Sequence, residues 1–152
     1  SQHCIGCFPR LEQGVAPACV RQCPGRAAFV GFLDDDAGAV AKLIRQWKVA
    51  LPLHPEYGTE PNVFYVPPLA PAPLREDGSY DEGGSRIPPS YLEELFGPEV
   101  HGALDVLRAE LDRKRRGQDS ELMDQLILYR WKDCLGHLDR DPAEIVWGAK
   151  GA

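Results

Sequence analysis

Hydrophobic residues recur at helical spacing in four stretches of the chain. The first follows an acidic run, Asp34-Asp35-Asp36, that suits the first turn of a helix, and it predicts a helix over residues 37–49. The other three lie in the last third, where helices are predicted at 89–96, at 100–117 and after Ser120. The apolar face of the last helix is too wide for a helix that packs on one side only. This face comprises Leu122, Met123, Leu126, Ile127, Trp131 and Leu135.

Two short runs of β-branched and aromatic residues predict strands, at 27–33 and at 62–66. The second run lies inside a stretch with seven prolines between Pro52 and Pro73, and these prolines rule out a long helix. Residues 75–85 are polar and rich in glycine, so an exposed loop is expected there.

Composition narrows the class of protein. Hydrophobic residues make up 43% of the 152 residues and charged residues 26%, so the chain can form a packed core. The net charge is −6 and the only basic run is Arg113–Arg116, which argues against nucleic-acid binding. No apolar segment reaches the length of a membrane span, and no signal peptide is recognised. The chain starts at Ser1 without an initiator methionine, which indicates a fragment or a processed piece.

Four of the five cysteines lie close to the start of the sequence. Two residues separate Cys4 from Cys7, eleven separate Cys7 from Cys19, and three separate Cys19 from Cys23, which Pro24 follows. The two ends of this pattern match the bacterial ferredoxin run C-x-x-C-x-x-C-x-x-x-C-P, whose fourth cysteine ligates the other cluster of a two-cluster fold. Cys4, Cys7 and Cys19 are therefore predicted to bind one [4Fe–4S] cluster, and Cys23 to bind a second.

The spacing has two further consequences. Residues 8–17 are predicted to be a loop that fills the expanded gap, and residues 18–22 one helical turn. Two four-iron clusters need eight thiolates, and this segment supplies four. The remaining ligands are therefore expected from a segment outside this chain.

Three other chemistries compete for these cysteines. A structural zinc site also uses four thiolates, but such a site does not require a proline directly after the last cysteine. A disulfide framework favours an even number of cysteines spread along the chain. A nucleophilic cysteine needs a base partner, and nothing in the sequence identifies such a base. Cys134 shares a helical face with Met123 and Ile127, so it is predicted to be a small buried apolar residue.

Longer blocks of sequence carry a resemblance to a known family. The blocks are the cysteine segments 4–10 and 18–26, residues 47–59 and 61–68, and the motifs Arg86-Ile87-Pro88, Tyr91-Leu92 and Leu95-Phe96-Gly97. Over about residues 3–135 the chain resembles the iron–sulfur β subunits of the dimethyl sulfoxide reductase family of molybdoenzymes. That family includes respiratory nitrate reductase and the type II group. The type II group comprises ethylbenzene dehydrogenase, dimethyl sulfide dehydrogenase, and selenate, chlorate and perchlorate reductases. The short connection from Cys23 to Trp47 is more similar to the type II group, within which the ethylbenzene dehydrogenase β subunit looks closest.

The resemblance implies an electron-transfer subunit with no catalytic residue of its own. Such a β subunit carries three [4Fe–4S] clusters and one [3Fe–4S] cluster, the last expected elsewhere in the full subunit. It links a molybdenum (bis-molybdopterin guanine dinucleotide) α subunit to a haem b γ subunit. By position, Cys4, Cys7 and Cys19 would ligate one cluster together with a cysteine from the missing N-terminal part of the subunit. Cys23 would complete the cluster nearest the α subunit.

The type II resemblance implies a periplasmic location, whereas nitrate reductase implies the cytoplasmic face of the inner membrane. The predicted fold class is α+β, with part of a bacterial-type two-cluster ferredoxin fold, a proline-rich irregular strap and a C-terminal helical region. The strap is expected to lie on a partner's surface, because it cannot pair its backbone within a helix or sheet. The predicted segments are the cysteine group 1–33, a connecting helix 34–50, the strap 51–88, a helical region 89–138 and a tail 139–152.

Several other residues have two interpretations. Three arginines lie near the cysteines: Arg10, Arg21 and Arg26. They could raise the reduction potential of an anionic cluster, or they could be ordinary surface arginines. His3 is interpreted as an exposed terminal residue, and His54 as structural, because no second ligand lies at a suitable spacing. Four aromatic residues are interpreted as core or interface packing instead of an electron relay; they are Trp47, Tyr57, Phe64 and Tyr65. The alternative function is a non-redox binding module with a structural zinc site.

Overall fold

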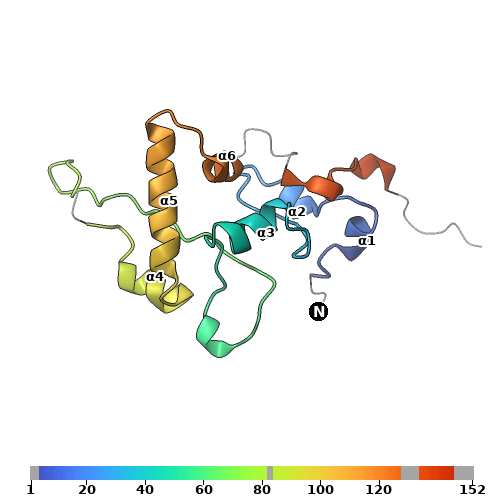
Figure 1. The fold of residues 1–152 in the computed structure, drawn as a ribbon, viewed down its shortest axis with the longest axis horizontal. Helices are drawn as coiled ribbons and strands as arrows, with labels where there is room; N and C mark the ends of the chain where they lie inside the picture. Colours follow the sequence, from blue (N-terminus) through green and yellow to red (C-terminus); the bar gives the residue numbers. More distant parts are fainter. Residues whose placement is uncertain (1–3, 82–83, 128–133, 146–152) are drawn as a thin grey trace, which may run out of the picture. The chain divides into compact units, whose positions relative to one another are not determined.

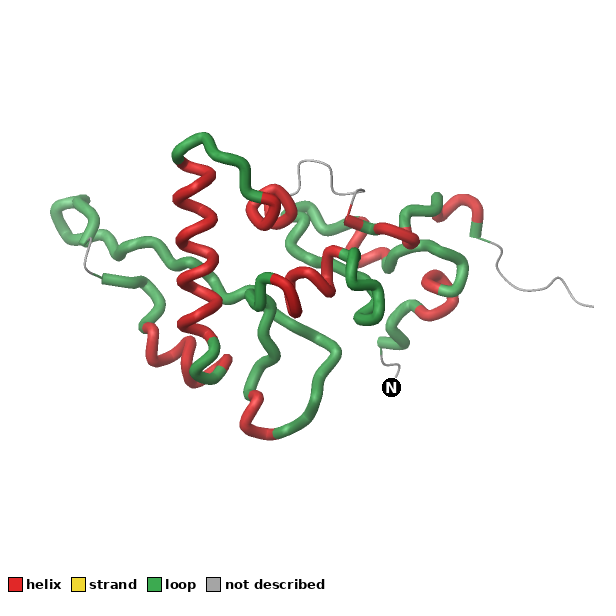
Figure 2. Tube along the Cα trace, viewed as in Figure 1, coloured by secondary structure: helices red, strands yellow, loops and turns green. Residues whose placement is uncertain are grey.

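The computed structural model describes residues 4–81, 84–127 and 134–145. Figure 1 shows helices joined by long connections, and Figure 2 shows loops wherever the described chain is not helical. The elements in chain order are α1 (Phe8–Leu11), α2 (Ala18–Arg21), α3 (Ala39–Ala41), the π-helical turn η1 (Lys42–Gln46), η2 (Pro55–Tyr57), α4 (Pro89–Phe96), α5 (Val100–Arg115), α6 (Glu121–Ile127), η4 (Gly136–Leu138) and η5 (Pro142–Glu144).

The chain divides into two compact units. Unit 1 joins both ends of the sequence, Ser1–Lys42 and Glu121–Ala152, and unit 2 is the middle, Leu43–Ser120. The five predicted segments follow chain order. Unit 1 instead combines the cysteine group and part of the connecting-helix segment with the end of the helical region and the tail. Among the described residues, no helix has both the length and the apolar character needed to cross a membrane.

Unit 1 is built where the start and the end of the chain pack together. Ala16, Leu135 and Leu138 form its buried cluster, and Leu11, Val20 and Val30 pack against this cluster. Ala16 N–H donates to the Leu138 carbonyl at 2.9 Å, and Val15 and Asp139 form an antiparallel bridge. The core of this unit therefore depends on contacts between residues that lie far apart in the sequence.

Unit 2 has a core between α4, α5 and the strap. Leu92 and Phe96 of α4 meet Val100, Ala103 and Leu104 of α5, and Leu51 completes the buried cluster. Gly97, at φ 74, ends α4, and its N–H donates to the Glu93 carbonyl at 2.8 Å. Glycine adopts this left-handed conformation without a Cβ clash, so it allows the sharp turn into α5.

The predicted helices are largely confirmed. Residues 89–96 are helical as predicted, α5 covers most of 100–117, and α2 supplies the turn expected at 18–22. The helix expected at 37–49 is shorter, because α3 and η1 together cover 39–46 and Lys48 has a positive φ of 53°. The last helix starts after Ser120 as expected, although Ile127 is 43% exposed and Trp131 lies outside the described residues.

Both predicted strands are wrong as regular strands. Residues 27–33 form a loop, and residues 62–66 contribute one isolated bridge, between Tyr65 and Leu51. A strand needs a neighbour to satisfy its backbone groups, and propensity alone does not supply one. The loop predicted at 8–17 is also wrong at its start, because α1 forms there with Pro9 in its first turn. Residues 75–80 are exposed as expected. The ferredoxin-type fold class stays a prediction.

Candidate functional site

The first cysteine pair lies on a tight turn. Gly6 and Cys7 both have left-handed backbone conformations, with φ of 65° and 55°. This turn brings the Gly6 N–H to 3.4 Å from the Cys4 Sγ, so the amide donates to the sulfur. The Cys7 carbonyl accepts hydrogen bonds from Arg10 N–H at 2.9 Å and Leu11 N–H at 3.1 Å, which begins α1. The backbone thus fixes Cys7 directly before residues 8–18, which we call the spacer between Cys7 and Cys19.

The second pair lies on α2 and on the turn that follows it. Cys19 belongs to the helical turn, and Cys23 follows its end. The Arg26 N–H donates to the Cys23 carbonyl at 3.1 Å, which closes a β-turn with Pro24 at its second position. The Ala27 N–H then donates to the Cys23 Sγ at 3.4 Å. The residues after the C-P dipeptide therefore fold back over the sulfur.

The backbone around Cys23 favours the thiolate. The hydrogen bond from Ala27 N–H is the largest effect and lowers the pKa of the Cys23 thiol below its ordinary value. Burial opposes this effect, and further amides from Gly25, Arg26 and Ala28 support it. Metals bind cysteine as the thiolate, so this environment suits a ligand.

The four predicted ligands fit iron–sulfur chemistry in their donor atoms. All four are free thiols, Cys4 and Cys19 exposed and Cys7 and Cys23 half-buried. Amide hydrogen bonds to cysteine sulfur are among the protein features that tune iron–sulfur clusters. Within residues 4–81, 84–127 and 134–145, however, no three His, Cys, Asp or Glu side chains gather as a metal site. The assignment of Cys4, Cys7 and Cys19 to one cluster therefore stays a prediction.

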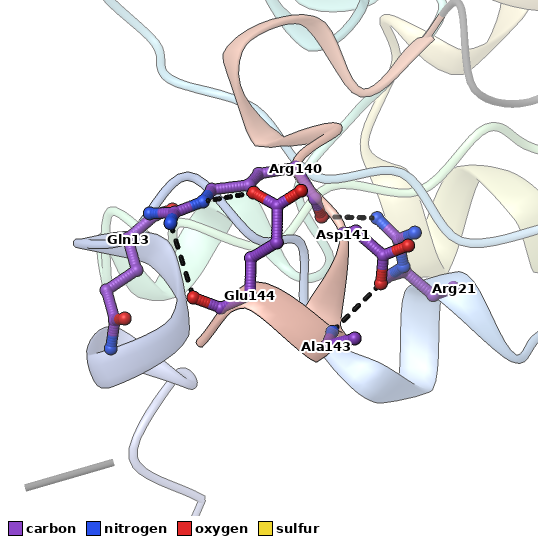
Figure 3. Close-up of polar contacts among 6 residues, drawn as sticks. All are labelled: Gln13, Arg21, Arg140, Asp141, Ala143 and Glu144. Carbon is purple, nitrogen blue, oxygen red and sulfur yellow. Dashed lines mark hydrogen bonds and ion pairs between the residues drawn. The ribbon is translucent and has the colours of Figure 1, made fainter. Parts of the chain in front are cut away.

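Arg140 fixes the spacer between Cys7 and Cys19, and sequence reasoning missed it. Its guanidinium donates to the Glu144 carboxylate at 3.0 Å and to the Gln13 carbonyl at 3.4 Å (Figure 3). Its backbone N–H donates to the Gly14 carbonyl at 3.1 Å. Arg140 was placed in a tail, because no local pattern marks a partner 127 residues away.

Two of the arginines near the cysteines also bind backbone carbonyls. Arg10 Nε donates to the Ala16 carbonyl at 3.3 Å, and Arg21 Nη1 donates to the Arg140 carbonyl at 3.3 Å (Figure 3). These contacts give Arg10 and Arg21 a structural role in holding the spacer. Their effect on a cluster potential stays a prediction, as does that of Arg26.

Cys134 was predicted to be a small buried apolar residue, and it is half-buried. It lies on the wall of a cavity of about 280 Å³ in unit 1, and Cys23, Phe29 and Val20 line the same cavity. His54, by contrast, is engaged locally: its Nδ1 lies 2.9 Å from the Glu56 carboxylate. This hydrogen-bond contact is of the kind expected for a structural role of His54.

Comparisons with known proteins place the chain in a family. No family model matches it. It is 56% identical over 138 residues to the selenate reductase β subunit of Thauera selenatis, an alignment that covers 90% of this chain and 42% of that protein. It is 53% identical over 130 residues to the dimethylsulfide dehydrogenase β subunit of Rhodovulum sulfidophilum, covering 86% and 40%. The respiratory nitrate reductase 1 β chain of Escherichia coli is 31% identical over 154 residues, covering 63% and 30%.

The chain belongs to the β subunits of the type II group of the dimethyl sulfoxide reductase family, as the sequence blocks predicted. Its relatives are β subunits of oxidoreductases. The chain spans about two fifths of the length of the first of these relatives.

Proposed function

We propose that this chain is part of an electron-transfer subunit whose cysteines hold iron–sulfur clusters. The observation that carries the proposal is the Cys23 turn, where the Ala27 amide donates to the sulfur and the thiol pKa is lowered. A structural zinc site shares the need for thiolates, but the match to the ferredoxin spacing and the family of reductase β subunits both favour iron.

The ligand assignment follows from the order of the cysteines. Cys4, Cys7 and Cys19 hold one [4Fe–4S] cluster, and Cys23 holds another, each completed by ligands outside this chain. Iron–sulfur clusters, when bound, take up and release one electron at a time. The role of this chain is to supply thiolates and to aim the Gly6 and Ala27 amides at two of the sulfurs. These donors stabilise added negative charge and so raise the reduction potential.

The subunit connects two redox partners in this proposal. One is a molybdenum-containing α subunit, where substrate is converted, and the other is a haem b subunit. No substrate bond is made or broken on this chain, so it contributes no catalytic residue. From the type II resemblance we take the periplasm as its location, with the cytoplasmic face of the inner membrane as the alternative that the resemblance to nitrate reductase implies.

Metal and sulfide analysis of the complete complex, purified without oxygen, tests the proposal. A brown protein with several irons per β subunit, acid-labile sulfide and EPR signals on reduction is the expected result. A colourless preparation with one zinc per chain would instead establish the non-redox binding module.

A further inference from the structure

The strap of unit 2 contains a loop that is closed at its base. Leu51 N–H donates to the Tyr65 carbonyl at 2.9 Å, and Tyr65 N–H donates to the Leu51 carbonyl at 2.8 Å. Residues 52–64 therefore leave and return at one point, with η2 at the far part of the loop (Figure 1). Loops of this length with joined ends are frequently functional. We call residues 52–64 the strap loop.

The backbone of the strap loop is held in an unusual conformation. His54 and Glu60 have positive φ angles of 50° and 44°, and both are followed by proline. A residue before proline is normally driven to an extended conformation, because the proline ring crowds its backbone. Gly58, at φ 61, lies between them. A non-glycine residue in this region costs free energy, and such residues concentrate at functional sites.

The conformation is reinforced by polar contacts at one end. His54 N–H donates to the Leu95 carbonyl of α4 at 2.7 Å, and the His54 ring pairs with the Glu56 carboxylate at 2.9 Å. The ring centroids of His54 and Tyr57 lie 5.4 Å apart. The loop is thus preorganised around Tyr57, which lowers the entropy cost of binding another surface.

The strap loop presents its aromatic residue to solvent. Tyr57 is 71% exposed, and Val63 and Tyr65 on the returning side are 58% and 46% exposed. Glu56 and Glu60 are also exposed and flank Tyr57. Tyrosine is enriched among the residues that dominate binding energy at protein interfaces, and acidic neighbours favour a basic partner surface.

We propose that the strap loop is a docking element that inserts the Tyr57 ring into an apolar socket with a basic rim on another subunit of the reductase complex. The strained backbone is maintained because it holds the ring in the orientation that the socket accepts. The partner cations around the socket pair with Glu56 and Glu60. The inference rests on the proposed function for the existence of a multisubunit complex, but it makes a separate claim about where the subunits meet.

Photo-crosslinking in the assembled complex tests the docking element. The full-length β subunit carries p-benzoylphenylalanine in place of Tyr57 and is irradiated in the complex with its partner subunits. The matched control carries the same residue in place of Tyr80, which is 62% exposed and lies in the separate loop closed by the Leu74–Tyr80 bridge. We expect position 57 to crosslink to another subunit and position 80 to give at most a tenth of that yield. Crosslinks from position 57 that stay within the β subunit, no crosslinks, or equal yields at the two positions would overturn the proposal.

Affinity provides a second readout. Tyr57→Ala should weaken the association of the β subunit with that partner by about tenfold or more, whereas Tyr80→Ala should leave it within about twofold. The double variant Glu56→Gln, Glu60→Gln should reduce the salt dependence of the association rate. Unchanged affinity in Tyr57→Ala contradicts the inference. Iron content and EPR signals are measured on every variant. If the unmodified complex lacked both, the proposed function would be rejected. The crosslinking result would then still decide whether the strap loop is a docking element.

Discussion

The Ser120 hydroxyl donates a hydrogen bond of 2.6 Å to the carboxylate of Glu110. Ser120 is 2% exposed, and Glu110 also accepts from Arg113 at 3.0 Å, while Arg113 donates to the Asp119 carbonyl. These contacts tie the chain that follows α5 back to the helix. The pKa of the Glu110 carboxyl lies below its ordinary value. The hydrogen bond from Ser120 is the largest cause, and the positive charge of Arg113 assists it.

Ser120→Ala should lower the free energy of unfolding by about 1–2 kcal/mol, because a partly buried hydrogen bond to a charged group is lost. A carboxylate with a lowered pKa contributes stability above its unfolded pKa, and that contribution disappears as the pH falls through the folded pKa. The difference between the two proteins should therefore be largest near neutral pH and shrink in acid, which urea unfolding at several pH values measures.

Ser79→Ala is the matched control for this prediction. Ser79 also donates a hydrogen bond of 2.6 Å, to Asp77, but both residues are exposed. Its removal should change stability by less than about 0.5 kcal/mol. A similar loss in the two variants would mean that the burial of Ser120 does not matter.

Arg140→Ala should loosen the spacer between the cysteines. The guanidinium contacts with Gln13 and Glu144 are lost, so the nearby amide of Ala16 should exchange its hydrogen about fivefold faster, as expected for a loss of about 1 kcal/mol. Hydrogen exchange followed by mass spectrometry measures this. Arg108→Ala, which removes an exposed ion pair with Asp105 in unit 2, should leave that amide unchanged. Equal exchange in all three proteins would show that Arg140 does not hold the spacer.

Gly14→Ala should destabilise unit 1 by about 1–3 kcal/mol. Gly14 has φ of 72°, and an added Cβ would lie 3.1 Å from the His137 carbonyl oxygen. Gly102→Ala offers the opposite case: it lies in α5 with open space around the added carbon, so it should stabilise by about 0.5 kcal/mol. Thermal unfolding of the two variants measures both signs, and a neutral Gly14→Ala would contradict the close approach.

Cys23→Ser and Cys7→Ser should affect different clusters in the complete subunit. The ferredoxin spacing assigns Cys7 to one cluster and Cys23 to the neighbouring one. EPR spectra of the reduced complex should therefore lose or alter different signals in the two variants. Loss of one and the same signal in both would refute the cross-ligation.

The helices could be predicted from the sequence because their causes are local. In α5, Val100, Leu104 and Leu107 repeat at helical spacing and are buried on one side, and Gly117 follows the helix. The strand predictions failed because a strand depends on its neighbour. Gly31 lies where an added Cβ would be 3.1 Å from a Val40 side-chain carbon, so the loop at 27–33 approaches α3 closely at this residue.

The candidate site divides in the same way. The cysteine pattern is short, and the turns at Gly6 and Pro24 follow from residues within a few positions. The groups that hold the spacer in place could not be predicted from neighbouring residues. Arg140 is hydrogen-bonded to Gln13 and to Arg21, which lie most of the chain length away in sequence. Their pairing is decided by the tertiary packing of Ala16 against Leu135 and Leu138.

That packing sets an order of events during synthesis. The bridge between Val15 and Asp139 and the Arg140 contacts cannot form until the ribosome has released the residues beyond 138. Until then, Leu11 and Val20 lack much of the apolar surface that covers them. The cysteine spacer is therefore translated well before the residues that complete its native packing, and it remains open to maturation factors and proteases in the interval.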